Sequence, residues 1–337
     1  MAIRTRTLTG PAETGAWGCG ATDLGILRDL GNGRVLAVFG DTFDGDRVGV
    51  GAWRSPVGLR GTIGGDGLPV FDQAAGTDPR WARQFWDYPH DNPTFSTVLP
   101  SDVVRLPDGA LVLHVMVNKG LGNVVWTELW RSTDNGTTWG HAGFTMDAGW
   151  DGGKRQLWTM EYNPADGYVY VMSTGFQRDK GIILWRSRWD RMWQLGEWQP
   201  WTFKNGRWQW GQVGDVPGEI VGGKWGELNL RIVDGTWCLT GFDAAAGQIV
   251  TNVLRGGPTS DFRYMPRVVH AQNGPWEADG LLNICAQPYG GYVVPGSRLG
   301  VDGGFKVVVS QWNTHASAAG PEGWPYRCLG YSGRVNR

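Results

Sequence analysis

Apolar and polar residues alternate in short runs along the chain, and turn-forming residues separate these runs. In the first pair, residues 24–30 and 34–39 flank the turn Gly31-Asn32-Gly33. Later pairs flank Asp108-Gly109, Asp166-Gly167 and Asp234-Gly235. An alternation of period two predicts β-strands, and Asn-Gly or Asp-Gly between two strands predicts a hairpin. We therefore expect consecutive antiparallel hairpins with little helix.

The hairpins belong to a longer repeat. The tripeptide Trp-Arg-Ser begins at Trp53, Trp130 and Trp185, each time at the end of an alternating run. Two further units cover residues 226–256 and 280–313. Five such units, each of roughly 45–75 residues, are typical of a β-propeller. The prediction is an all-β, five-bladed β-propeller that forms one domain over residues 1–337. A parallel β-helix or a sandwich fits less well, because the units are long and self-contained.

The segment from Ser132 to Trp139 follows the Asp-box pattern Ser-x-Asp-x-Gly-x-x-Trp. In this hairpin the Ser and Asp side chains bind turn amides, and the Trp packs between blades. The motif therefore predicts a propeller blade, and we assign it a structural role away from the active face.

Composition excludes several classes of partner. The 31 Lys and Arg residues balance 32 Asp and Glu residues, which leaves a net charge of −1 without any basic block. A nucleic acid or an anionic membrane therefore has no electrostatic footprint here. The longest apolar run, residues 111–117, is interrupted by His114 and is far too short to span a bilayer. We expect a soluble protein with no nucleic-acid partner and no membrane insertion.

The cysteines and histidines show no metal-binding spacing. Cys19, Cys238, Cys285 and Cys328 are scattered, with no CxxC pair. No phosphate-binding loop stands out either, so we expect no metal site and no required cofactor. A disulfide and a structural cation in a central channel both stay open. The N-terminal segment lacks the apolar core of a signal peptide.

Tryptophan is unusually abundant, with 21 residues. Many of them lie in two insertions, at about residues 60–95 and 191–216. Aromatic rings offer flat apolar surfaces to sugars, and long loops on a rigid scaffold often carry binding sites. We expect both insertions to rise on the active face as two walls beside the catalytic residues. The alternative is that they are lids packed on neighbouring blades.

Two aspartates lie at matched distances from the first turn. Asp23 precedes Asn32 by nine residues and Asp41 follows it by nine, so a hairpin returns both to one end of the blade. A three-residue loop would place them directly opposite, with Cβ atoms about 5 Å apart. A two-residue loop would place them on opposite faces, unless a bulge re-aims one. Two carboxylates at a propeller mouth suit glycoside hydrolysis, in which one is a protonated acid and the other is ionised.

The motifs around these aspartates resemble a known family. They are GATDLG (20–25), FGDTF (39–43), WRSP (53–56), QPYGGYVVPGS (287–297) and VSQWN (309–313). Over roughly residues 15–330 the chain is similar to the domain-of-unknown-function family 4185, which includes the endo-D-arabinanases of glycoside hydrolase family 183. The resemblance implies a five-bladed propeller that cleaves α-D-arabinofuranosyl linkages in mycobacterial-type arabinogalactan or lipoarabinomannan. It also implies that Asp23 and Asp41 are the catalytic residues.

Further polar and aromatic side chains are candidates for binding this polysaccharide. They are Glu161, Glu227, Asp91, Asn92, His114, Trp158 and Trp86. Glu161 and Glu227 lie at the expected starts of innermost strands, where a side chain would face the central funnel. For each candidate the alternative is a structural role, as a satisfied polar group of the channel or as part of the core.

The activity expected is mid-chain cleavage of D-arabinan, with inversion favoured over retention. A sialidase-like hydrolase would need three arginines and a tyrosine nucleophile, and no such set stands out. A non-catalytic sugar-binding propeller, such as a phage tail adhesin, would tolerate loss of either aspartate, yet both are present. A cell-envelope substrate predicts action outside the cytoplasm. A phage origin or a trimmed chain would explain the lack of a signal peptide.

Overall fold

The computed structural model describes residues 2–262, 265–318 and 324–337. Strands supply most of the regular secondary structure in these residues, and the helical segments among them are short 3₁₀ turns. Those turns are η1 (Gly15–Trp17), η2 (Trp150–Gly153), η3 (Leu195–Glu197), η5 (Trp276–Ala278) and η6 (Ala316–Ala318). The prediction of an all-β fold is confirmed.

The first two sheets are antiparallel meanders of consecutive strands. The first contains β2 (Ala21–Asp29), β3 (Val35–Phe43), β5 (Val57–Ile63) and β6 (Pro69–Ala74), with β4 (Trp53–Arg54) beside β3. The second contains β7 (Thr97–Arg105), β8 (Leu111–Asn118), β9 (Val124–Ser132) and β10 (Gly140–Asp147). In both, the glycine-containing turns connect the first two strands where the sequence pattern predicts them.

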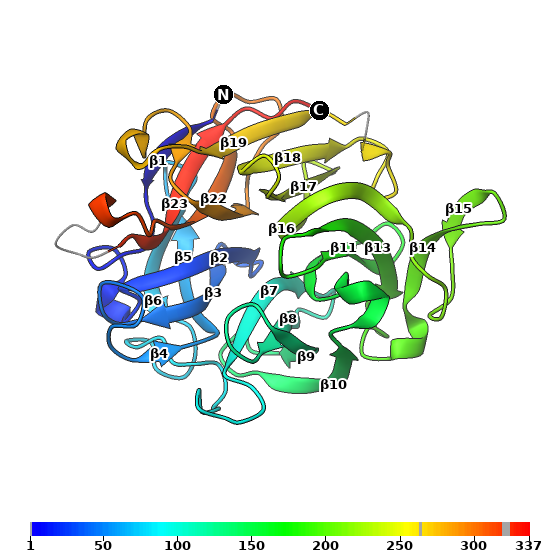
Figure 1. Ribbon diagram of the computed structural model, residues 1–337, viewed down its shortest axis with the longest axis horizontal. Helices are drawn as coiled ribbons and strands as arrows, with labels where there is room; N and C mark the ends of the chain where they lie inside the picture. The colour runs from blue at the N-terminus through cyan, green and yellow to red at the C-terminus, as the bar shows by residue number, and fades with distance from the viewer. Residues whose placement is uncertain (1, 263–264, 319–323) are drawn as a thin grey trace.

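A ten-stranded sheet combines the next two meanders. It contains β11 (Leu157–Asn163), β12 (Tyr168–Thr174), β13 (Lys180–Arg188), β14 (Gln199–Lys204), β15 (Arg207–Trp210), β16 (Glu219–Val233), β17 (Thr236–Asp243), β18 (Gln248–Leu254), β19 (Arg267–Asn273) and β20 (Ile284–Cys285). The long β16 joins the two meanders, because it pairs with β13 near its start and with β17 further on. The hairpin of β14 and β15 projects from the edge of the molecule (Figure 1).

The last sheet brings the two ends of the chain together. It contains β1 (Ile3–Thr7), β21 (Pro288–Val293), β22 (Phe305–Trp312) and β23 (Tyr326–Gly333), and β1 pairs with β23. Figure 1 shows the sheets arranged around a common centre, with both termini on one side. Strands β2, β7, β11, β16 and β21 contact one another in this cyclic order. They are therefore the inner strands of a propeller.

Two cavities lie at opposite ends of the central axis. On β16, Glu227 lines the first cavity and Arg231 lines the second. On β11, Leu157 lines the first and Glu161 the second. Strands β2 and β21 repeat this order. Because earlier residues always line the first cavity, the inner strands run in the same direction along the axis.

A network of buried charges links the inner strands near the second cavity. Arg28 on β2 donates to Glu161 on β11 (2.7 Å), and Arg231 on β16 donates twice to Asp102 on β7 (2.7 and 2.8 Å). Asp102 is fully buried and also accepts from the Met160 amide. Charges can be buried at tolerable cost only when they are paired and hydrogen-bonded. This network therefore ties four inner strands together.

The Asp box has the structural role that its pattern predicts. Ser132 Oγ accepts from the Gly136 amide, and Asp134 Oδ1 accepts from the two amides that follow it in the turn, at positions 137 and 138. Trp139 is buried, and its ring stacks on Phe85 with centroids 5.3 Å apart. The Asp box thus joins the second sheet to the segment that follows the first.

The structure also settles the state of the cysteines. All four are buried free thiols, so the disulfide that the sequence left open is not formed. Over the described ranges, no helix combines the length and apolar character needed to cross a bilayer.

The buried ion network should contribute strongly to stability. We expect Asp102→Ala to lower the free energy of unfolding by about 3–5 kcal/mol, because Arg231 would keep a buried charge without its partner. Urea denaturation followed by tryptophan fluorescence measures this. The control is Asp72→Ala. The side chain of Asp72 is 46% exposed and pairs with Arg34. That change should cost less than about 1 kcal/mol, and equal effects of the two substitutions would contradict the prediction.

Candidate active site

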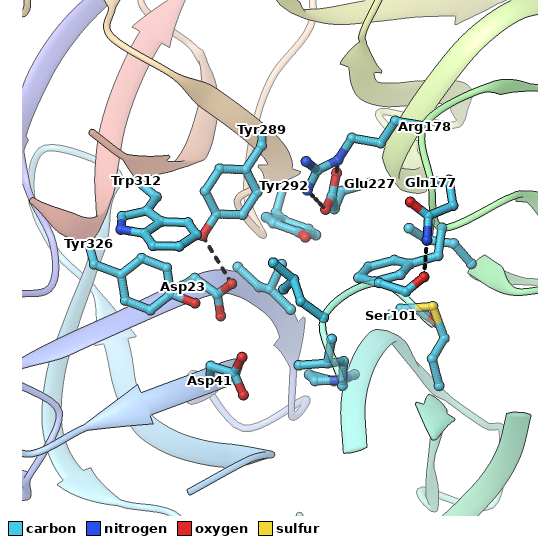
Figure 2. A pocket seen from close by; sticks show the side chains of 18 of the residues that line it. Asp23, Asp41, Ser101, Gln177, Arg178, Glu227, Tyr289, Tyr292, Trp312 and Tyr326 are labelled. Atoms are coloured by element: carbon cyan, nitrogen blue, oxygen red, sulfur yellow. Dashed lines mark hydrogen bonds and ion pairs between the residues drawn. The ribbon is translucent and has the colours of Figure 1, made fainter. Parts of the chain in front are cut away.

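A cavity of about 540 Å³ opens at the end of the axis where the inner strands begin. Carboxylates, tyrosines and apolar side chains line it (Figure 2). Its polar and aromatic residues are Asp23, Asp41, Ser101, Gln177, Arg178, Glu227, Tyr289, Tyr292, Trp312 and Tyr326. Both aspartates of the first hairpin therefore reach this cavity, from the neighbouring strands β2 and β3.

The register of the β2–β3 hairpin brings the two aspartates together. The Leu30 amide donates to the Arg34 carbonyl and closes a three-residue turn. Of the two loop lengths that the sequence allowed, the longer one is therefore present. This register places Asp23 and Asp41 across from each other at the far end of the hairpin.

A bulge at the end of the hairpin then aims the side chains. Gly40 and Asp41 of β3 lie opposite Asp23 alone, which is the two-against-one count of a β-bulge. Leu24 and Gly25 follow on β2 with φ of 66° and 80°. The left-handed region is unusual for a leucine. The extra residue on β2 compensates for the extra one on β3, so the regular pairing resumes.

Asp23 is almost completely enclosed, with 9% of the residue exposed. The Tyr289 hydroxyl donates to Oδ2 (3.0 Å), whereas Oδ1 is buried without a hydrogen-bond partner in the described residues. A Cβ on Gly40 would come within 2.6 Å of Oδ1, so this glycine leaves the space for the carboxyl. Burial, and then the charge of Asp41, raises the pKa of Asp23 to about 8 against the opposing tyrosine hydrogen bonds. Asp23 is therefore protonated at neutral pH.

Asp41 has more hydrogen-bond donors than Asp23. Its Oδ1 accepts from Trp53 Nε1 (2.7 Å) and from Thr97 Oγ1 (3.2 Å). Burial raises the pKa of Asp41, while these two hydrogen bonds and the charge of His90 lower it. Donors of this kind favour the ionised carboxylate. On balance, burial keeps the pKa of Asp41 above its ordinary value, but Asp41 has two donors and the charge of His90 acting against burial. The two carboxyls thus differ: Asp23 lacks this support and retains its proton more strongly than Asp41 does.

Glu227 on β16 faces the same cavity as part of an ion pair. Arg178 Nε lies 3.1 Å from Glu227 Oε2, and Arg178 Nη2 contacts the other oxygen. Arg178 belongs to the β12–β13 loop, where it has a φ of 58°, and its guanidinium lies 5.2 Å from the Tyr289 ring centroid. The structure thus places Glu227 at the cavity, with its charge balanced.

Three other candidates for substrate binding lie away from this cavity. Glu161 is four residues beyond Leu157, about 13 Å along the strand, and it lines the second cavity, of about 410 Å³. His114 and Trp158 are fully buried, and their rings stack with centroids 4.1 Å apart. Burial holds the pKa of His114 well below its usual range. The expectation that these side chains line the active site is wrong, because they belong to the ion network and the core.

The remaining candidates lie in the segment before β7 and do not line the cavity. Trp86 stacks on Trp130 with centroids 3.8 Å apart. The Asn92 carbonyl accepts from the Lys119 ammonium, and the neighbouring Asp91 is exposed. These three predicted contacts with substrate are therefore also corrected, because this segment packs against the first and second sheets outside the cavity lining.

The two aromatic insertions do not form walls of this cavity. None of its lining residues comes from residues 60–95 or 191–216. The first insertion lines a separate cavity together with Trp53 and Trp139. The second forms the projecting β14–β15 hairpin, and Trp201 and Trp208 line a groove there. The expectation of two walls is wrong. Phe85 and Trp86 of the first insertion pack on the second sheet, as the alternative of a lid on a neighbouring blade expects, and the second insertion projects from the edge of the molecule.

Several lining residues had no role assigned from the sequence. Tyr289 and Trp312 lie in the two closing motifs, 287–297 and 309–313, so those motifs contained a signal. Tyr326 and Arg178 lie outside those motifs, so nothing in the local sequence marked them. In the described part of the chain, no group of three or more His, Cys, Asp or Glu side chains is arranged to hold a metal ion.

Sequence comparison relates the chain to proteins from bacteria and fungi. Residues 9–331 match the model of the family described as "Domain of unknown function (DUF4185)". The chain is 32% identical to notoamide biosynthesis cluster protein J′ of Aspergillus versicolor, covering 96% of this chain and 90% of that protein. It is 29% identical to an uncharacterized 35.9 kDa protein of Mycolicibacterium smegmatis, covering 95% and 94%.

Solved structures with a similar fold include several glycosidases. A putative hydrolase from Bacteroides ovatus aligns with a TM-score of 0.61 at 13% identity, over 95% of this chain and 87% of that one. A family 117 glycoside hydrolase from Zobellia galactanivorans gives 0.52 at 10% identity, over 98% and 90%. The arabinanase of Bacillus subtilis gives 0.51 at 12% identity, over 91% of both chains. These likenesses show a fold of the propeller type.

The protonation of Asp23 can be tested directly. We expect ¹³C NMR of the aspartate carboxyls to show Asp23 titrating near pH 8, as its surroundings dictate. Tyr289→Phe should move this midpoint to higher pH, because it removes a donor that favours the ionised form. Tyr168→Phe, on β12 and outside the cavity lining, should leave it unchanged. A midpoint near the ordinary value of about 4 would contradict the prediction.

Proposed function

The chain belongs to the DUF4185 family, and on that basis we propose that it is a glycoside hydrolase acting through Asp23 and Asp41. The observation that carries the proposal is the unequal state of two neighbouring carboxyls in one cavity. Asp23 is enclosed and retains its proton, whereas Asp41 is held by two donors. Glycoside hydrolysis uses such a pair, and the likeness of the fold to known glycosidases supports the assignment.

In the mechanism we propose, the two aspartates act on opposite sides of the scissile bond. Asp23 donates its proton to the leaving glycosidic oxygen as the bond to the anomeric carbon breaks. Asp41 accepts a proton from a water whose oxygen forms the new bond to that carbon. Trp53 and Thr97 hold Oδ1 of Asp41, so Oδ2 is the oxygen assigned to the water. Asp23 ends ionised and Asp41 protonated, and the anomeric configuration is inverted.

The lining of the cavity favours an uncharged sugar. Among the described lining residues, Arg178 is the only Arg or Lys, and Glu227 already pairs with it. A sialic acid would need several free arginines, so the sialidase-like alternative loses support. Tyr289, Tyr326 and Trp312 offer aromatic surface to an uncharged ring.

The substrate we propose is the α-linked D-arabinan of mycobacterial-type arabinogalactan or lipoarabinomannan, cleaved within the chain. Its support is the resemblance of the opening and closing motifs to endo-D-arabinanases. A polysaccharide of the cell envelope places this activity outside the cytoplasm. For the scaffold we propose five blades, because β2, β7, β11, β16 and β21 each begin one meander around the axis.

Loss of either carboxyl should abolish turnover without unfolding the protein. We expect Asp23→Asn and Asp41→Asn each to lower kcat at least ~10³-fold, as removal of an acid or base does. The assay is the release of reducing ends from purified arabinogalactan, with circular dichroism to check the fold. Asp72→Asn, on β6 of the same sheet and outside the cavity, is the control and should retain activity. Near-normal activity of both active-site variants would refute the assignment.

The products should reveal both the substrate and the mode of cleavage. We expect a ladder of short arabino-oligosaccharides early in the reaction, and ¹H NMR should show that each new reducing end first has the inverted configuration. Release of monosaccharide alone would reject mid-chain cleavage, and a trapped glycosyl-enzyme would reject inversion. Activity on sialosides or L-arabinan without activity on D-arabinan would reject the substrate.

A further inference from the structure

His90, in the segment before β7, has both ring nitrogens against backbone carbonyl oxygens. Nδ1 lies 2.7 Å from the Ser96 oxygen and Nε2 lies 3.1 Å from the Trp53 oxygen. A carbonyl oxygen only accepts hydrogen bonds, and a neutral imidazole has only one N–H. In the neutral form, one nitrogen would therefore turn its lone pair towards an oxygen. Only the imidazolium, with two N–H groups, satisfies both contacts.

The ring of His90 stacks directly on Trp53. Their centroids lie 3.8 Å apart with an angle of 14° between the planes, which suits a cation over an aromatic face. Phe43 lies near-parallel to the same indole, with centroids 6.3 Å apart and an angle of 15°. The backbone of Trp53 also pairs with Phe43 where β4 meets β3. The indole is thus held in one plane.

The indole plane determines where the Trp53 N–H points. It donates to Asp41 Oδ1 at 2.7 Å, so a continuous series of contacts runs from His90 through Trp53 to the carboxylate. A cation on one side of a polarisable ring strengthens a hydrogen bond donated from that ring. The series ends at the oxygen assigned above to the ionised partner of the pair.

We propose that His90 is a positioning residue, held as an imidazolium, whose charge acts through the Trp53 indole to keep Asp41 ionised and aimed into the cavity. This inference rests on the proposed function only for its effect on turnover. The segment before β7 would thus act on the cavity through Trp53, although it does not line the cavity. Consistent with it, the positive charge of His90 lowers the pKa of Asp41.

Other titratable groups surround this series. Tyr88 meets the His90 ring edge-on, with centroids 5.1 Å apart, and its hydroxyl donates to the Ser55 carbonyl. Asp23 faces Asp41 across the cavity. His90 also lines the separate cavity described above, and the charged residues there include Asp78, Arg80, Arg83 and Asp87. Arg80 and Arg83 pair with Asp78 at 3.8 and 4.0 Å. The contacts of the imidazolium itself are with carbonyls and rings.

The first test reads the protonation state of His90 in the unaltered protein. Two-bond ¹H–¹⁵N NMR distinguishes an imidazolium from either neutral tautomer by the shifts of the two ring nitrogens. We expect the imidazolium pattern for His90 at pH 7, because both ring nitrogens face carbonyl oxygens. A neutral tautomer at pH 7 would overturn the proposal, whatever the activity of the enzyme.

The second test separates charge from packing. His90→Phe keeps a ring on Trp53 without the charge, and His90→Gln removes both ring and charge. We expect both variants to raise the midpoint of Asp41 in ¹³C NMR by about half a pH unit or more, as loss of a nearby cation does. The acidic limb of the kcat profile should move by the same amount.

The outcomes of the second test decide whether the charge of His90 or only its packing acts on Asp41. An unchanged Asp41 midpoint in His90→Phe would overturn the proposal, because packing alone would then account for the stack. If the unaltered enzyme cleaves no glycan, the proposed function fails, while the two NMR measurements still decide the role of His90. If neither variant folds, the ¹⁵N measurement on the native chain decides it.

Discussion

The centre of this protein depends on one buried ion network, made by Arg28, Asp102, Glu161 and Arg231. Each of these side chains comes from a different inner strand, so the charges find their partners only when the sheets have assembled around the axis. An unpaired charge at this position would cost several kcal/mol. The network therefore makes correct assembly a condition for burying the polar centre, and it occupies the axis beside the second cavity.

The opposite end of the axis shows what happens when carboxylates lack such partners. Among the described residues that line the first cavity, Arg178 is the only cation, and it pairs with Glu227. Asp23 therefore has no counter-ion, and burial is compensated by retention of its proton. For Asp41, burial also raises the pKa, but the hydrogen bonds from Trp53 and Thr97 and the positive charge of His90 oppose it. At one end of the axis, ion pairs offset the cost of burying charges. At the other end, the same cost raises the pKa of Asp23 and keeps it protonated as an acid.

Strand direction explains which of the two predicted glutamates lines the first cavity. Glu161 and Glu227 both lie on inner strands, and the sequence treats them alike. Glu227 precedes Arg231 and reaches the first cavity, whereas Glu161 follows Leu157 and reaches the second. Four residues of extended chain decide whether a glutamate lines the first cavity or joins the central ion network. Composition cannot show this, because both ends of a propeller axis are polar.

The sequence by itself determined the strands, the glycine turns, the Asp box and the return of Asp23 and Asp41 to one end of the first hairpin. Each of these follows from local rules: side-chain alternation, turn conformation and counting along one hairpin. Only the tertiary structure decided that the bulge at Gly40 aims both carboxyls into one cavity. It also decided that the aromatic insertions lie away from the cavity, that His114 and Trp158 are core, and that His90 stacks behind Trp53. These features depend on contacts between residues far apart in the chain, whose distances are set by how the sheets pack around the axis.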